Sequence, residues 1–130
     1  MAKAQPNLGW LEEACTSLNE DSAYRALGST DVKVAFIIGD VRKLVVFEAF
    51  EIGGVQDLSD ARDADLIVRM SVRDWNAYLR KRKKGTGPSL LSLDIDHRVV
   101  EAANPLKKVM FERYNTSLQA FIDRGAALAG

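Results

Sequence analysis

The fold of this chain is decided by residues 64–82, which read ADLIVRMSVRDWNAYLRKR. The first part is rich in β-branched and large apolar residues, and alternate positions share one face of an extended segment: Leu66, Val68 and Met70. Ser71 follows at the position of a helix N-cap, and Asp74 brings a negative charge into the first helical turn. The stretch therefore predicts a strand that runs directly into a capped helix.

The predicted helix carries aromatic side chains on one face. Its apolar residues recur at helical spacing: Val72, Trp75, Tyr78 and Leu79. Arg73 and Asn76 fall on the opposite side of the same helix. A strand that ends in such a helix places an aromatic wall over a sheet, and what lies between the wall and the sheet is the functional question.

A run of cations extends this helix: Arg80, Lys81, Arg82, Lys83 and Lys84. Cations complement the negative end of the helix dipole, so a solvated helix end is the simpler interpretation. Because the helix also has an apolar face, a weak contact with an anionic membrane is the alternative, worth about 1 kcal/mol per charge. The 18 Lys and Arg residues balance 18 Asp and Glu residues, so we expect no nucleic-acid partner.

Before this stretch, the sequence predicts two helices and a β-hairpin. The expected elements are helices at 10–18 and 22–27, strands at 32–38 and 42–52, and a short strand at 55–56. Turns at Gly39-Asp40 and at Gly53-Gly54 separate the strands. Both faces of the long strand are apolar near its middle, so we expect it to lie inside the sheet rather than at an edge.

After this stretch the pattern is less regular. The expected elements are a short helix at 90–93, a last strand at 106–111, and a closing helix with apolar positions at Tyr114, Leu118, Phe121, Ile122 and Gly125. The segment 94–104 is compatible with a loop or a short strand. This order of elements predicts an α+β fold in which helices lie on a mostly antiparallel sheet, in one domain of residues 1–130.

Composition limits where the protein works. The one cysteine, Cys15, excludes an internal disulfide and suits a reducing compartment. Residues 1–13 contain no apolar signal-peptide core, and no apolar run approaches the length of a membrane span. We therefore expect a cytoplasmic protein.

Few residues have the pattern of a catalytic or metal site. The single histidine, His97, has Asp94 and Asp96 beside it, but the spacing of a metal site is missing, so a solvated polar turn is the favoured interpretation. Cys15 lies on an apolar helix face, where a buried core thiol is expected. Glu48 interrupts an apolar strand face and is the one candidate for a general base. We expect no metal and no cofactor.

Several stretches resemble the sterol carrier protein type two family of sterol-binding and lipid-transfer domains. They are LNED at 18–21, VAFIIGD at 34–40, VVF at 45–47, ADLIVRMSVRDW at 64–75 and FERY at 111–114. The fourth is the most specific, because it is similar to the family's pattern of Ala-Asp, an apolar strand, Ser or Thr, and an acidic-aromatic pair. The resemblance implies a five-stranded, mostly antiparallel sheet covered by helices, with an apolar tunnel between them.

The resemblance also implies a function. Proteins of this family are generally non-enzymatic carriers of sterols, fatty acids or fatty acyl-CoA. Our first hypothesis is therefore that this chain binds or transfers such an apolar molecule in a cavity between the sheet and the helices. The expected ligand contacts are Trp75, Tyr78 and Leu79 in one wall, and Phe111, Leu118 and Phe121 in the other.

Two other functions stay open. A small cone-shaped α+β enzyme, an isomerase or hydrolase, would use Glu48 or an aspartate as a base in an apolar cup; a strand through residues 114–121 would favour it. An accessory subunit would instead use an apolar groove to receive a partner protein.

Overall fold

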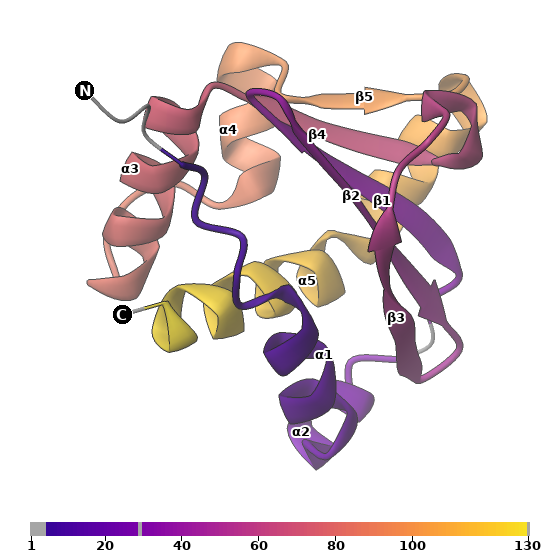
Figure 1. Cartoon of the computed structure of the whole chain (residues 1–130). Coiled ribbons are helices and arrows are strands. Elements are labelled where there is room, and N and C mark those ends of the chain that lie inside the picture. The colour runs from indigo at the N-terminus through magenta and orange to yellow at the C-terminus, as the bar shows by residue number, and fades with distance from the viewer. Residues whose placement is uncertain (1–4, 29, 130) are drawn as a thin grey trace.

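The computed structural model of the chain describes residues 5–28 and 30–129 (Figure 1). Its helices are α1 (Leu11–Asn19), α2 (Ser22–Arg25), the short 3-10 helix η1 (Ala61–Asp63), α3 (Val72–Lys83), α4 (Leu90–His97) and α5 (Pro105–Leu128). Its strands are β1 (Val32–Ile38), β2 (Val41–Glu48), β3 (Glu51–Asp57), β4 (Leu66–Met70) and β5 (Val100–Ala102). The predicted α+β class is confirmed.

The five strands form one mixed, mostly antiparallel sheet in the order β3-β2-β1-β4-β5. Antiparallel pairing joins β1 to β2, β2 to β3 and β4 to β5, whereas β1 and β4 run parallel with Val34 opposite Leu66. The predicted strand at 32–38 coincides with β1, and β2 lies inside the sheet as expected. The strand of the stretch 64–82 is thus held between β1 and β5, away from the sheet edges.

The long strand expected at 42–52 is wrong, because the chain reverses within it. Strand β2 ends at Glu48, and Ala49 takes a left-handed φ of 51° in the turn before β3. Phe47 therefore pairs with Ile52, and Phe50 lies at the turn with 47% of its surface exposed. Residues 48–51, which form this turn, include no glycine or proline. Because the usual turn residues are missing, the apolar pattern predicts one continuous strand.

The turn expected at Gly53-Gly54 is also wrong. Both glycines lie within β3, where the pairing with β2 shifts between Val46 and Phe47. Gly54 has a φ of 146°, a backbone conformation that side chains rarely adopt. The glycine pair therefore accommodates an irregularity in a strand, a role that the sequence does not distinguish from a turn.

The last strand expected at 106–111 is wrong as well, because these residues form the first turns of α5. Asn104 caps this helix by accepting a hydrogen bond from the Lys107 backbone N–H at 3.0 Å, and Pro105 occupies the first helical position. The strand at this edge of the sheet is instead β5, within the segment that the sequence left open.

The helices pack on one face of the sheet, and Figure 1 shows α1, α3 and α5 on the same side of it. Aromatic rings fill the centre of this interface: Trp10, Phe36, Phe47, Trp75 and Phe121. The opposite face holds a smaller apolar cluster, in which Leu58 and Ala64 from the β3–β4 connection cover Ala35, Ile37 and Leu44. The main core therefore lies between the sheet and the helices.

Candidate functional site

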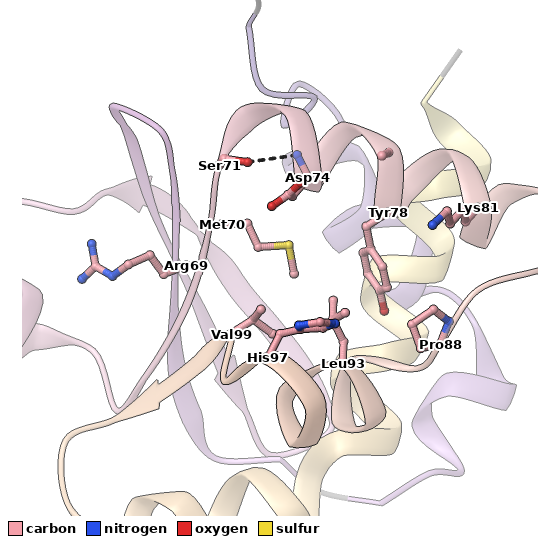
Figure 2. Close-up of a pocket in the computed structure, with 11 residues that line it drawn as sticks. Arg69, Met70, Ser71, Asp74, Tyr78, Lys81, Pro88, Leu93, His97 and Val99 are labelled. Carbon is pink, nitrogen blue, oxygen red and sulfur yellow. Dashed lines mark hydrogen bonds between the residues drawn. The ribbon is translucent and has the colours of Figure 1, made fainter.

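A cavity of about 660 Å³ lies where the end of β4, one face of α3 and α4 meet (Figure 2). Its apolar lining comes from Met70, Ala77, Tyr78, Pro88, Leu93 and Val99, and its polar lining from Arg69, Ser71, Asp74, Lys81 and His97. This volume falls within the range of small-molecule sites, roughly 300–1,000 Å³. The combination of an apolar wall with a few polar groups suits an amphiphilic ligand.

The stretch that decides the fold also builds one wall of this cavity. Ser71 caps α3 by accepting a hydrogen bond from the Asp74 backbone N–H at 3.1 Å, as its position in the sequence predicts. The cap ends β4 at Met70 and starts α3 in the next turn. Positions 74, 77, 78 and 81 then follow one another along one side of the helix. A strand, a cap and a helical stripe thus line one side of the cavity.

The opposite wall is α4, which is tied to α5 at its N-terminus and near its middle. At the N-terminus, the Leu90 backbone N–H donates to Gln119 Oε1 at 2.5 Å. Near the middle of the helix, the buried Asp94 accepts hydrogen bonds from the Val100 N–H at 2.8 Å and from Lys108 Nζ at 2.5 Å. Asp94 is therefore a structural residue that joins α4 to β5 and α5.

Polar side chains surround the cavity from different elements. Figure 2 shows the Met70 side chain in the middle of the view, with Asp74 on one side of it and His97 on the other. His97 is the exposed last residue of α4. The solvated polar turn expected around it is wrong, because residues 94–97 belong to this helix and Asp94 is buried. Arg69 points away from the other lining residues in Figure 2, and its Nε donates to Glu101 at 2.7 Å. Among the described residues, no three His, Cys, Asp or Glu side chains gather as metal ligands.

Of the six expected ligand contacts, Tyr78 lines this cavity. The other five lie in the core, each with 2% or less of its surface exposed: Trp75, Leu79, Phe111, Leu118 and Phe121. Ring centroids lie 5.7 Å apart between Phe36 and Trp75 and 5.4 Å apart between Phe47 and Phe121. These five residues therefore pack against other side chains of the protein in this structure.

Sequence reasoning missed most of the cavity lining. Once α3 is predicted, helical spacing places Asp74, Ala77 and Lys81 along one side of it, so this part of the lining could have been predicted from the sequence. Leu93 and Val99 carry no such signal, because they face α3 only through the packing of α4 and the pairing of β5 with β4.

The basic run at the end of α3 divides into two groups. Arg82 donates two hydrogen bonds to the Asp123 carboxylate, and Lys83 Nζ donates to the Ala129 carbonyl at 2.9 Å. The other three cations have exposed side chains: Arg80, Lys81 and Lys84. Two of the five charges thus fasten α3 to α5, and the other three are exposed, with Lys81 also part of the cavity lining.

Neither Cys15 nor Glu48, the candidate general base, lies at the cavity. Cys15 is buried on α1, and burial together with the nearby Glu12 raises the pKa of its thiol to about 11, so it stays protonated at neutral pH. Glu48 is exposed at the end of β2. Residues 114–121 form part of helix α5, so the strand that would favour the cone-shaped enzyme is a helix instead.

No described helix is both long enough and apolar enough to span a bilayer.

Known structures share this architecture, although no family model and no curated protein matches the chain. The crystal structure of sterol carrier protein 2 superposes with a TM-score of 0.69 at 18% identity, over 93% of this chain and 95% of that chain. A conserved hypothetical protein from Thermus thermophilus, described as possibly a sterol carrier protein, gives a TM-score of 0.74 at 16% identity, over 100% and 94%. UbiJ-SCP2, described as a ubiquinone synthesis protein, gives 0.51 at 18%, over 90% and 89%. The chain therefore has the fold of sterol carrier protein 2 over nearly its whole length.

Proposed function

We propose that this chain is a non-enzymatic binder or carrier of an apolar small molecule of the sterol, fatty acid or fatty acyl class. The main support is the whole-length likeness to the fold of sterol carrier protein 2, combined with a cavity of about 660 Å³ that apolar and polar side chains line together. Binding energy would come from buried apolar surface, at about 25 cal/mol per Å².

The ligand would lie in the cavity between α3 and α4, where Tyr78 contacts it directly. The five other expected contacts are proposed for a second state of the protein. Because Trp75 and Phe121 are fully buried against the sheet, a ligand would reach them only after the helices separate from β1 and β2. Substitutions in the cavity and substitutions in the core should therefore affect ligand binding differently, depending on which of the two positions the ligand occupies.

The experiment is a titration with a fluorescent fatty acid, together with native mass spectrometry of freshly purified protein. Ala77→Phe adds a ring within the cavity and should abolish saturable binding. Ala127→Phe adds the same ring at an exposed position near the end of α5 and should leave binding unchanged. Saturable binding that survives Ala77→Phe but is lost in Trp75→Phe would place the ligand in the core instead. No saturable binding by the unaltered protein would reject the proposed function.

Chain length provides an independent measurement. Each buried CH₂ group contributes about 0.8 kcal/mol, so two further carbons should tighten binding roughly tenfold until the chain fills the cavity. A series of saturated fatty acids should therefore show a steep rise in affinity followed by a plateau. Affinity that does not depend on chain length would contradict an apolar site.

We also propose that the exposed cations of α3 make a weak contact with anionic membranes. Arg80, Lys81 and Lys84 lie at one end of the helix that lines the cavity, and Lys81 is part of the lining. Co-sedimentation with phosphatidylserine vesicles should weaken when these three become Gln, by about 1 kcal/mol per charge at low salt. Replacing exposed cations elsewhere, Lys33, Arg62 and Arg113, is the matched control.

A further inference from the structure

The side-chain amide of Gln119 has an orientation that its partners determine. Its Oε1 accepts a hydrogen bond from the Leu90 backbone N–H at 2.5 Å, and its Nε2 donates to Asp123 Oδ1 at 2.9 Å. A backbone N–H can only donate, and an ionised carboxylate can only accept. The reversed amide would face the N–H with its own NH₂ group and the carboxylate with its own oxygen. The hydrogen-bond partners therefore exclude it.

This orientation determines which way the hydrogen bond to Tyr78 runs. The Gln119 Nε2 atom lies 3.4 Å from the Tyr78 hydroxyl and can only donate to it. The phenolic oxygen therefore accepts, and its own proton is left for another partner. Within the described part of the chain, this is the one hydrogen bond recorded at that hydroxyl.

The nearby carboxylate already has other hydrogen-bond donors, so it does not need the Tyr78 hydroxyl as a donor. Asp123 is the nearby acceptor, and its two carboxylate oxygens accept hydrogen bonds from Arg82 Nε at 2.9 Å and Nη2 at 2.8 Å. Burial also raises the pKa of Tyr78, so the hydroxyl keeps its proton throughout the neutral range. The Tyr78 side chain has 4% of its surface exposed and lines the cavity, and Figure 2 shows its hydroxyl directed toward the side of Leu93 and Pro88.

We propose that the Tyr78 hydroxyl is a specificity-determining donor, which gives a hydrogen bond to an oxygen atom carried by the apolar ligand. This inference rests on the proposed function and deepens it. The ligand would be an apolar body that carries a carbonyl, hydroxyl or carboxylate oxygen, rather than a pure hydrocarbon. Gln119 is a positioning residue, because its NH₂ group occupies the acceptor side of the Tyr78 oxygen and leaves the proton for the ligand.

The test compares dodecanoic acid, methyl dodecanoate, dodecanol and dodecane as competitors of a bound fluorescent fatty acid. Tyr78→Phe keeps the ring and removes the donor. A neutral hydrogen bond contributes modestly, so this variant should bind the three oxygen-containing probes about twofold to tenfold more weakly, with dodecane unchanged. A loss confined to dodecanoic acid would assign the acceptor to a carboxylate, whereas equal losses for the acid and the ester would assign it to any oxygen.

Gln119→Glu tests the direction of the hydrogen bond. The variant is combined with Asp123→Asn, because a carboxylate at position 119 would otherwise face the Asp123 carboxylate. The new carboxylate then accepts from Tyr78, so the proton is withdrawn from the ligand although both side chains keep their size. Relative to Asp123→Asn alone, the preference for oxygen-containing probes over dodecane should fall as in Tyr78→Phe, and adding Tyr78→Phe should cause no further fall. A purely structural role of Gln119 would weaken all four probes by the same factor.

The outcomes separate this inference from the proposed function. If the fluorescent fatty acid does not bind the unaltered protein, the proposed function fails. If it binds but Tyr78→Phe changes the affinity for dodecane and for the oxygen-containing probes equally, or changes neither, the hydroxyl is no specificity determinant and this inference alone is overturned.

Discussion

The indole ring of Trp10 occupies the space beside Gly125 where a side chain would begin. A β-carbon at position 125 would lie 2.3 Å from both Cε3 and Cζ3 of the ring. Glycine in the middle of a helix costs about 1 kcal/mol relative to alanine. At this position it allows Trp10 to lie against α5 and to stack on Trp75, with 6.3 Å between the ring centroids.

Gly125→Ala should therefore destabilise the protein although alanine is the better helix former. The overlap forces Trp10 or α5 to move, which typically costs about 1–3 kcal/mol in a packed core. Urea unfolding measures the change. Gly9→Ala is the matched control, because nothing lies within 4 Å of a β-carbon at that position. If both variants unfold at the same urea concentration, Trp10 is not constrained by Gly125.

Ser71→Ala should lower the free energy of unfolding by about 1 kcal/mol, since the Asp74 N–H then loses its capping acceptor. Ser71→Asp supplies another good capping oxygen and should retain most of the stability. Thermal unfolding of the three proteins tests this order. Equal losses in both variants would contradict the capping role of the Ser71 hydroxyl.

Arg82→Gln should weaken the attachment of α3 to α5. The side chains of Arg82 and Asp123 are 20% and 39% exposed, so solvent screens their pairing and a loss of roughly 1 kcal/mol is expected. The exposed pair Arg73–Asp74, 3.9 Å apart, provides the control variant Arg73→Gln, which should have no measurable effect. Urea unfolding at low and high salt measures both changes. Equal losses of stability in the two variants would contradict the attachment of α3 to α5 through Arg82 and Asp123.

Alkaline pH should destabilise the protein partly through Cys15. Its pKa rises from 9.0 to about 11 in the folded protein, chiefly through burial and secondarily through Glu12. Below pH 9 the thiol is protonated in both the folded and the unfolded state, and its contribution to the free energy of unfolding is fully present. Between pH 9 and 11 the unfolded state loses the proton first, so stability falls as pH rises.

Unfolding of the wild type and of Cys15→Ala at pH 8 and at pH 10.5 measures this contribution. The alanine variant lacks the thiol and should lose less stability between the two pH values, whatever its stability at pH 8. The pKa of Tyr24 also rises, to about 12, so the variant should still lose some stability. Identical losses in both proteins would contradict a buried, protonated thiol.

The sequence predicts an element well where its signal is local. Strand β1 coincides with the predicted 32–38, and the strand, cap and helix of the stretch 64–82 fall where alternation, Ser71 and helical spacing place them. The two errors in the strands have one cause. In both places, apolar residues continue a strand-like pattern although the backbone changes conformation. The chain turns at Ala49, which has a positive φ, and a helix begins after Asn104, which caps α5.

The candidate site was predicted only in part, because helical spacing does not tell which apolar residue of α3 lies deepest. Trp75 and Tyr78 share one face of the helix, yet Trp75 packs among aromatic rings while Tyr78 also lines the cavity. That difference depends on how α3 lies relative to β1 and α5.

The sequence alone determined the class of the fold and the capped strand–helix unit, because these depend on periodicity and capping within a few residues. The likeness to sterol carrier proteins came instead from short motifs, chiefly ADLIVRMSVRDW at 64–75. Tertiary structure decided where the cavity lies, since β5 pairs with β4 and α4 is fastened to Gln119 and Lys108. It also decided that the Tyr78 hydroxyl accepts a hydrogen bond from Gln119 and keeps its own proton for another partner. That proton depends on residues up to 41 positions apart in the chain, whose contacts no local pattern encodes.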